Sequence, residues 1–182
     1  MIVNKENNSV LQEVFKPVSE SSAILLEIEK AFRGHIPNVF SAYAEHPALL
    51  AANWEKFKAV MLQGKLRRKV KEVIASVISY DNKCNYCVAA HSTALHSMKV
   101  SKLEIAAMFQ GTLPNDFSEK EVALVKFARK ANLNWHSIGN ADIKELVDLE
   151  IEESEMLEAL GTMELFIVFN RFAVVMGIET DF

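Results

Sequence analysis

The strongest constraint on the fold is one apolar stripe in the middle of the chain. Val70, Val73, Ile74, Val77 and Ile78 recur at the i, i+3, i+4 spacing of a single buried helix face. Glycine and proline, which interrupt regular structure, number only 6 and 4 in 182 residues. No run shows the clean alternation of a strand that leads into a hairpin turn. The pattern therefore predicts an all-α fold with long helices.

Helix-start and helix-stop signals divide the chain into expected helices. Ser101 with Glu104, and Ser118 with Glu121, have the spacing of capping boxes. Periodicity leaves one alternative open, a short strand at 166–169, because a brief apolar run fits either structure. The expected helices cover residues 23–33, 37–43, 48–63, 66–80, 83–98, 101–110, 118–132, 141–149, 153–160 and a last one ending near 177.

The chain is expected to form one domain at residues 21–182, preceded by a polar arm at residues 1–20. Two segments hint at a duplicated helical unit within the domain. Leu95, Ser101 and Glu104 align with Leu146, Glu152 and Glu155 at a constant offset of 51. Chance similarity between amphipathic helices is the alternative interpretation.

The charge pattern argues against nucleic acid and membrane as partners. The net charge is −4, and the single basic run, Lys65 to Lys71, is short and is interpreted as a solvated helix face. The most apolar stretch, Leu165 to Ile178, contains Asn170 and Arg171 and is too short for a bilayer span. No signal peptide is apparent at the start. We therefore expect a soluble cytoplasmic protein.

The chain has only two cysteines, and they are three residues apart. On a helix Cys84, Cys87 and His91 would share one face, with neighbours about 5–6 Å apart. Unpaired N–H groups in a first helical turn, together with a nearby histidine, favour the thiolate, which is the reactive form of cysteine. In a reducing compartment such a pair indicates a redox, catalytic or metal site.

A dithiol of this kind can complete a peroxide reaction by itself. A thiolate that attacks peroxide becomes a sulfenic acid, and a second thiol nearby condenses with it to a disulfide. His91 is suited to move the proton, and Glu72 would orient His91 if the chain turned back at Asp81 and Asn82.

The spacing Glu72-x11-Cys84-x2-Cys87-x3-His91 resembles that of the alkylhydroperoxidase AhpD-like proteins within the carboxymuconolactone decarboxylase superfamily. The run from Asn82 to His91 is similar to its peroxidase-related branch. The resemblance extends from about residue 36 to Gly111, which is the expected core, and weakens over the C-terminal third.

The resemblance implies an all-helical homo-oligomer, a trimer or hexamer, that reduces hydroperoxides without a cofactor or metal. It implies that Cys87 is the peroxidatic thiol and Cys84 the resolving thiol, with His91 and Glu72 as the proton relay. The electron donor would be a thiol reductant or a lipoyl or other dithiol carrier protein. Tyr86 stands where well-characterised members have a further histidine, and is expected to be a pocket residue.

Two other interpretations of the same residues stay open. A redox sensor or structural member of the fold would form the disulfide without turnover. A metal site would use Cys84, Cys87 and His91, with His96 or Glu72 as a fourth ligand. Structural zinc usually takes its ligand pairs from two segments, which makes this interpretation weaker.

Overall fold

The structure, a computed structural model, describes residues 19–182, so most of the expected arm at residues 1–20 lies outside the described residues. Residues 19–182 form helices and turns with no strand, as the all-α prediction requires. The described elements are α2 (Ser19–Ala31), α3 (Asn38–Ser41), α4 (Pro47–Phe57), the π-helical turn η1 (Lys58–Leu62), α5 (Arg68–Asp81), α6 (Asn85–Ser97), α7 (Lys102–Phe109), α8 (Glu119–Asn134), the 3-10 turn η2 (Trp135–Ser137), α9 (Asn140–Asp148) and α10 (Glu153–Val175).

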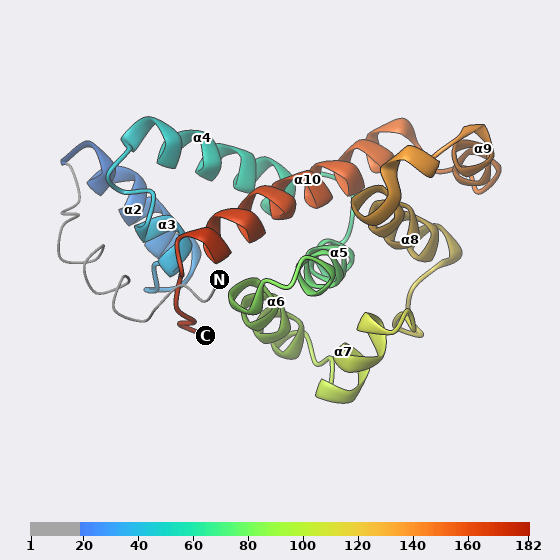
Figure 1. The fold of residues 1–182 in the computed structure, drawn as a ribbon, viewed down its shortest axis with the longest axis horizontal. Helices are drawn as coiled ribbons and strands as arrows, with labels where there is room; N and C mark the ends of the chain where they lie inside the picture. Colours follow the sequence, from blue (N-terminus) through green and yellow to red (C-terminus); the bar gives the residue numbers. More distant parts are fainter. Residues whose placement is uncertain (1–18) are drawn as a thin grey trace.

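Helix α5 lies at the centre of the fold. It packs against α6, α7, α8 and α10, while α10 also contacts α6 and α8 (Figure 1). Helices α2, α3 and α4 lie at one end of the molecule and α9 at the other (Figure 1). All ten residues from Val70 to Ser79 are buried, because neighbours surround α5 on several sides. The predicted stripe is therefore correct but incomplete, since polar residues off the stripe are buried with it.

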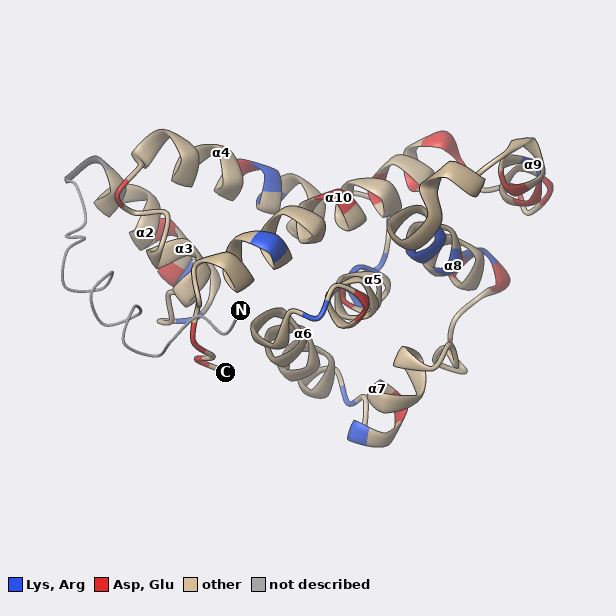
Figure 2. Ribbon diagram, in the orientation of Figure 1, with Lys and Arg blue, Asp and Glu red and all other residues tan. Residues whose placement is uncertain are grey.

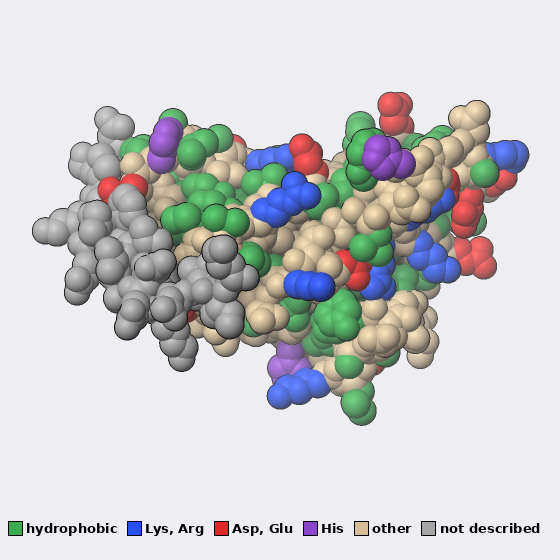
Figure 3. All heavy atoms as spheres, viewed as in Figure 1, with side chains coloured by type: hydrophobic (Ala, Val, Ile, Leu, Met, Phe, Trp, Pro, Cys, Tyr) green, Lys and Arg blue, Asp and Glu red, His purple; other side chains and the backbone are tan. Residues whose placement is uncertain are grey.

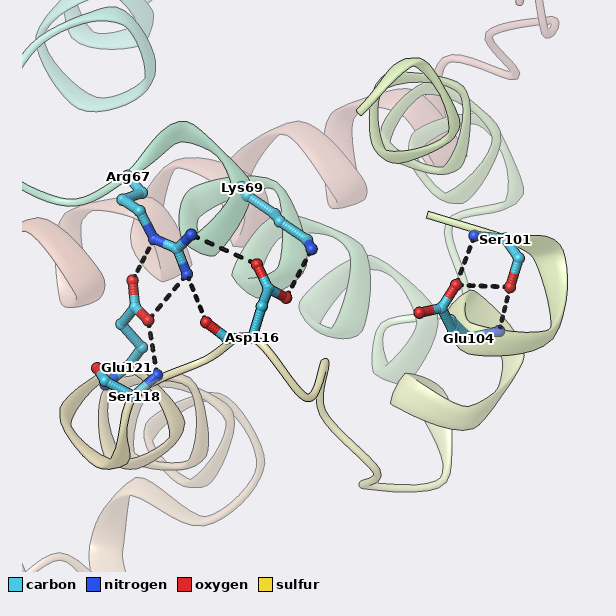
Figure 4. A network of polar contacts seen from close by, with 7 residues as sticks. All are labelled: Arg67, Lys69, Ser101, Glu104, Asp116, Ser118 and Glu121. Carbon is cyan, nitrogen blue, oxygen red and sulfur yellow. Dashed lines mark hydrogen bonds and ion pairs between the residues drawn. The ribbon is translucent and has the colours of Figure 1, made fainter. Parts of the chain in front are cut away.

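The two predicted capping boxes are confirmed (Figure 4). The Ser101 hydroxyl accepts the N–H of Glu104 at the start of α7. At the start of α8 the Glu121 carboxylate accepts the N–H of Ser118 and also binds the Arg67 guanidinium (Figure 4). One side chain thus caps α8 and ties it to the start of α5.

The interpretation of Lys65 to Lys71 as a solvated helix face is wrong for two of its members. Lys71 is only 1% exposed, and its ammonium group binds the Gln63 carbonyl and lies 3.1 Å from the Glu158 carboxylate. Arg68 is about one-third exposed, and its guanidinium pairs with the buried carboxylate of Glu72. Each of the two cations is paired with a carboxylate, which offsets the cost of removing charge from water.

Three expected boundaries differ from the structure. The helix expected at 48–63 ends as α-helix at Phe57 and continues as the π-turn η1. The helices expected at 153–160 and onward to 177 form one 23-residue helix, α10, that runs through Gly161. The strand alternative at 166–169 is wrong, because these residues lie inside α10 and pack on the core.

The two segments that suggested duplication have the same local form. After α6 the chain passes through Lys99 in the left-handed region, and after α9 it does so at Glu150, before a capping box opens the next helix. In each case a backbone N–H three residues past the helix end donates to a carbonyl in the last turn of the helix, Val100 to Leu95 and Ile151 to Leu146. Duplication of the whole unit remains a prediction.

Charged side chains are spread over most of the helices. Blue and red segments are scattered along the ribbon, and acidic residues gather on α9 and the first turns of α10 (Figure 2). The visible face likewise has no continuous basic area outside the grey atoms (Figure 3). No helix within residues 19–182 has the length and apolar character needed to cross a membrane.

Gly64 is the glycine on which packing depends most. Its φ of +93° is left-handed, and an added Cβ would collide with the Glu158 carboxylate that receives the N–H groups of Lys65 and Leu66. We expect Gly64→Ala to lower the free energy of unfolding by about 2–3 kcal/mol, because backbone strain adds to displacement of Glu158.

Gly111→Ala is the matched control for Gly64→Ala. Gly111 has φ +96°, and no heavy atom lies within 4 Å of the Cβ that alanine would add there. It should lose only the backbone contribution, about 1 kcal/mol. Equal losses for the two variants in urea denaturation would contradict the role given to Glu158.

Candidate active site

The two cysteines meet at the start of α6. Lys83 adopts a left-handed φ of +60°, which turns the chain out of α5, and the N–H of Cys84 then bonds to the Ser79 carbonyl. Cys84 itself is the N-cap of α6. Its Sγ accepts the N–H of Cys87 at 3.3 Å and lies 2.6 Å from the Cys87 Sγ. Both cysteines are free thiols in contact.

The pKa values of the two cysteines are shifted in opposite directions. The hydrogen bond between the two sulfurs, helped by the Cys87 backbone N–H, lowers the pKa of Cys84 although burial opposes it. The same contact with Cys84, together with burial, raises the pKa of Cys87. The contact therefore favours ionisation of Cys84 over ionisation of Cys87.

Glu72 reaches the cysteine helix because the chain reverses between α5 and α6. Its carboxylate Oε2 lies 2.7 Å from Nδ1 of His91, and its Oε1 accepts the Nε–H of Arg68 at 2.7 Å. Glu72 is fully buried, and Arg68 is held in place by donating to the Met61 carbonyl at 2.9 Å. The carboxylate thus bridges a guanidinium and an imidazole.

The carboxylate of Glu72 stays ionised despite its burial. Burial alone would raise its pKa, but the charges and hydrogen bonds of His91 and Arg68 outweigh that effect and lower the pKa from 4.5. Sequence reasoning missed Arg68, because it lies within the basic run that was assigned to solvent. The signal available was its position four residues before Glu72, the spacing of an ion pair on one helix.

Asn170 connects the cysteine turn to α10. Its Nδ2 donates to the Ser79 hydroxyl at 3.0 Å, and its Oδ1 accepts from Nδ2 of Asn82 at 3.0 Å. Its amide also lowers the pKa of Cys84. Asn170 is buried in the core, so these bonds fix the turn that presents Cys84.

A pocket of about 490 Å³ opens beside the cysteine helix. Cys87, His91, Glu72 and Arg68 line it, whereas Cys84 does not. Cys87 is 4% exposed and Cys84 is fully buried, so access from the pocket is to Cys87. The remaining wall is largely aromatic, and its phenylalanines are Phe32, Phe40, Phe57, Phe166, Phe169 and Phe182.

Tyr86 lines this pocket, and its hydroxyl has a structural partner. The phenolic oxygen accepts the N–H of Val39 at 3.2 Å. Burial, reinforced by the Asp181 carboxylate nearby, raises the pKa of Tyr86. A phenol held neutral in this way is a poor proton carrier at neutral pH.

The metal interpretation has no geometric support in the described chain. Between residues 19 and 182 no three His, Cys, Asp or Glu side chains are grouped closely enough to hold a metal ion. His96 has another partner, because its Nδ1 lies 3.3 Å from the carbonyl oxygen of Val100, in the turn that follows α6.

The two cysteines, Glu72 and His91 lie within a region shared with known proteins. Residues 47–130 match the model of the carboxymuconolactone decarboxylase family. An alkyl hydroperoxide reductase of Mycobacterium tuberculosis is 30% identical over 81 residues. That match covers 44% of this chain and 23% of the relative, so the chain corresponds to less than a quarter of that protein.

Solved structures extend the likeness to the whole fold. The AhpD core of a peroxidase-related protein from Ralstonia eutropha, 25% identical, superposes with a TM-score of 0.78 over 91% of this chain and 87% of its own. The resemblance to AhpD-like proteins is confirmed. The AhpD-like fold of this chain includes the C-terminal third, where the sequence resemblance was weak.

Two further structures have the AhpD-like fold. A peroxidase-related protein from a Silicibacter species is 23% identical, with a TM-score of 0.78 over 91% of this chain and 87% of its own. A debrominase solved with 2,3,4-tribromopyrrole is 19% identical, with a TM-score of 0.74 over 90% of this chain and 86% of its own. These likenesses concern the fold alone.

Proposed function

We propose that the protein is a thiol-dependent peroxidase that reduces hydroperoxides with Cys87 and Cys84. The observation that supports this most is the position of Cys87, which faces an apolar pocket while its sulfur touches a second thiol. The buried pair of Glu72 and His91 lines the same pocket and supplies a route for protons.

The first step is oxidation of Cys87. The Cys84 thiolate takes the proton of Cys87 across the sulfur contact, and the Cys87 thiolate then attacks the distal oxygen of the hydroperoxide. The O–O bond breaks, Cys87 becomes a sulfenic acid, and the alkoxide takes a proton from His91 as general acid, while Glu72 holds the Nδ1 side of the imidazole. The products are an alcohol and oxidised Cys87.

The second step forms the disulfide. The Cys84 sulfur attacks the sulfenic sulfur of Cys87, the S–OH bond breaks, and water leaves with the proton from Cys84. The contact between the sulfurs makes this step intramolecular and therefore fast. A dithiol reductant, such as a lipoyl carrier protein, then reduces the disulfide by thiol exchange and is itself oxidised.

Several broader statements belong to the same proposal. The enzyme would work in the cytoplasm, as one AhpD-like domain at residues 21–182 and as a homo-oligomer. A redox sensor is the alternative function, favoured by the near-complete burial of both sulfurs, which restricts reduction by a bulky partner.

Turnover separates these two functions. With dihydrolipoamide in excess, we expect each protein molecule to consume many equivalents of cumene hydroperoxide, because the reductant restores both thiols. Loss of hydroperoxide can be followed by a colorimetric assay. Consumption that stops after one equivalent, with dihydrolipoamide and dithiothreitol alike, would contradict the enzyme and favour the sensor.

A further inference from the structure

The chain after α10 returns to the pocket. Beyond Val175, residues 176–182 leave the helix, and Figure 1 shows the chain end beside α3 and α6. Contacts with Asn38 of α3 and Tyr86 of α6 agree with this placement. A segment distant in sequence from the cysteines therefore forms part of their surroundings.

Asp181 anchors this segment. Its Oδ2 accepts the backbone N–H of Asn38 at 2.7 Å, and Nε2 of His35 lies 3.2 Å from the same oxygen as a close charge contact. The Nδ2 of Asn38 donates to the Glu179 carbonyl at 3.1 Å. The backbone and side chain of one residue thus hold the segment at two points.

The anchor places Phe182 in the pocket wall. Its ring centroid lies 5.6 Å from that of His35 and 5.6 Å from that of Tyr86, and all three residues line the pocket. Tyr86 immediately precedes Cys87, and Cys87 lines the same pocket as Phe182. Phe182 is half-exposed, so its ring lies where the aromatic wall meets solvent.

We infer that Phe182 is a specificity-determining residue, which favours bulky apolar hydroperoxides over hydrogen peroxide, and that Asp181 is the residue that positions it. The inference rests on the proposed function. Hydrogen peroxide is too small to contact both Cys87 and an aromatic ring across the pocket. A hydroperoxide with a phenyl group would bury that group against Phe182 and gain the energy of an aromatic pair.

The test is the ratio of two rate constants for oxidation of the thiols, one with cumene hydroperoxide and one with hydrogen peroxide. In Phe182→Ala we expect the ratio to fall about fivefold, the effect of losing one aromatic contact. Thr180→Ala is the matched control, because Thr180 is an exposed residue of the same segment. A ratio within twofold of wild type in Phe182→Ala, or an equal fall in Thr180→Ala, would overturn the inference.

A double-mutant cycle tests the positioning role of Asp181. Asp181→Ala alone should lower the ratio about as much as Phe182→Ala, because the ring is no longer held in the wall. The double variant should then resemble either single variant, since both remove the same contact. Independent, multiplying losses would show that Asp181 does not act through Phe182.

Binding of an unreactive analogue separates this inference from the proposed function. Cumyl alcohol has the same bulk as cumene hydroperoxide but no O–O bond, and its Kd can be measured by calorimetry. We expect the Kd to rise about fivefold in Phe182→Ala. If no hydroperoxide oxidises the thiols while this rise in Kd is seen, the peroxidase proposal fails, but the contact between Phe182 and a bulky apolar ligand is supported. If peroxides react but the Kd is unchanged, only the inference fails.

Discussion

Cys87→Ser should abolish hydroperoxide reduction, with a rate indistinguishable from that of buffer containing reductant. A serine hydroxyl at this position is not ionised near neutral pH and is a far weaker nucleophile toward oxygen than a thiolate. Cys84 remains in the variant, but it is fully buried and does not line the pocket. The measurement is consumption of cumene hydroperoxide with dihydrolipoamide in excess.

Cys84→Ser is the informative counterpart of this variant. It leaves the pocket thiol in place and removes its partner, so Cys87 should react once to a sulfenic acid and then stop. A sulfenic-acid trap such as dimedone should label one site per chain at Cys87. Full turnover in Cys84→Ser would mean that Cys84 is not the resolving thiol. Dimedone labelling of Cys84 in Cys87→Ser would mean that the roles of the two cysteines are reversed.

Glu72→Gln should slow thiol oxidation by about 10²–10⁴-fold, the range for loss of a proton-transfer group. The amide has nearly the volume of the carboxylate but no charge, so His91 loses the partner that lies 2.7 Å from its Nδ1. Arg68→Met is a graded control, because it leaves the contact between Glu72 and His91 in place. A smaller loss in Glu72→Gln than in Arg68→Met would contradict the relay.

Ionised Glu72 should also stabilise the folded protein, and this contribution should be lost in acid. Burial opposes its charge, but His91 and Arg68 lower its folded pKa below 4.5, so its contribution is present above pH 4.5 and is lost as the pH falls through the lowered value. Glu72→Gln removes this titration. Urea unfolding of the variant should therefore depend less on pH between about 5 and 3 than that of wild type.

Helix content was predictable because it depends on local patterns. The apolar stripe of α5 and the capping boxes at Ser101 and Ser118 are short-range features, and the structure contains all three. The cap of α6 was not predictable in the same way. It depends on Lys83 adopting a left-handed φ, a backbone conformation that residues other than glycine seldom adopt.

The sequence allowed the reactive residues of the site to be predicted, but not the residues that surround them in the fold. Cys84, Cys87 and His91 share one helix region, so their spacing brings them together. Arg68 and Asn170 join them through tertiary packing of α5 and α10, which no local pattern encodes. The contribution of Asp181 and Phe182 to the pocket depends on a long-range return of the chain after α10.

The central claim is that Cys87 and Cys84 form a peroxide-reactive pair, and counting thiols tests it most directly. Purified, reduced protein would be treated with one equivalent of cumene hydroperoxide, alkylated, and its cysteine peptide weighed by mass spectrometry. We predict rapid loss of both thiols and a peptide two hydrogens lighter, which is the mass of an internal disulfide. Two thiols that remain alkylatable after this treatment would contradict the claim.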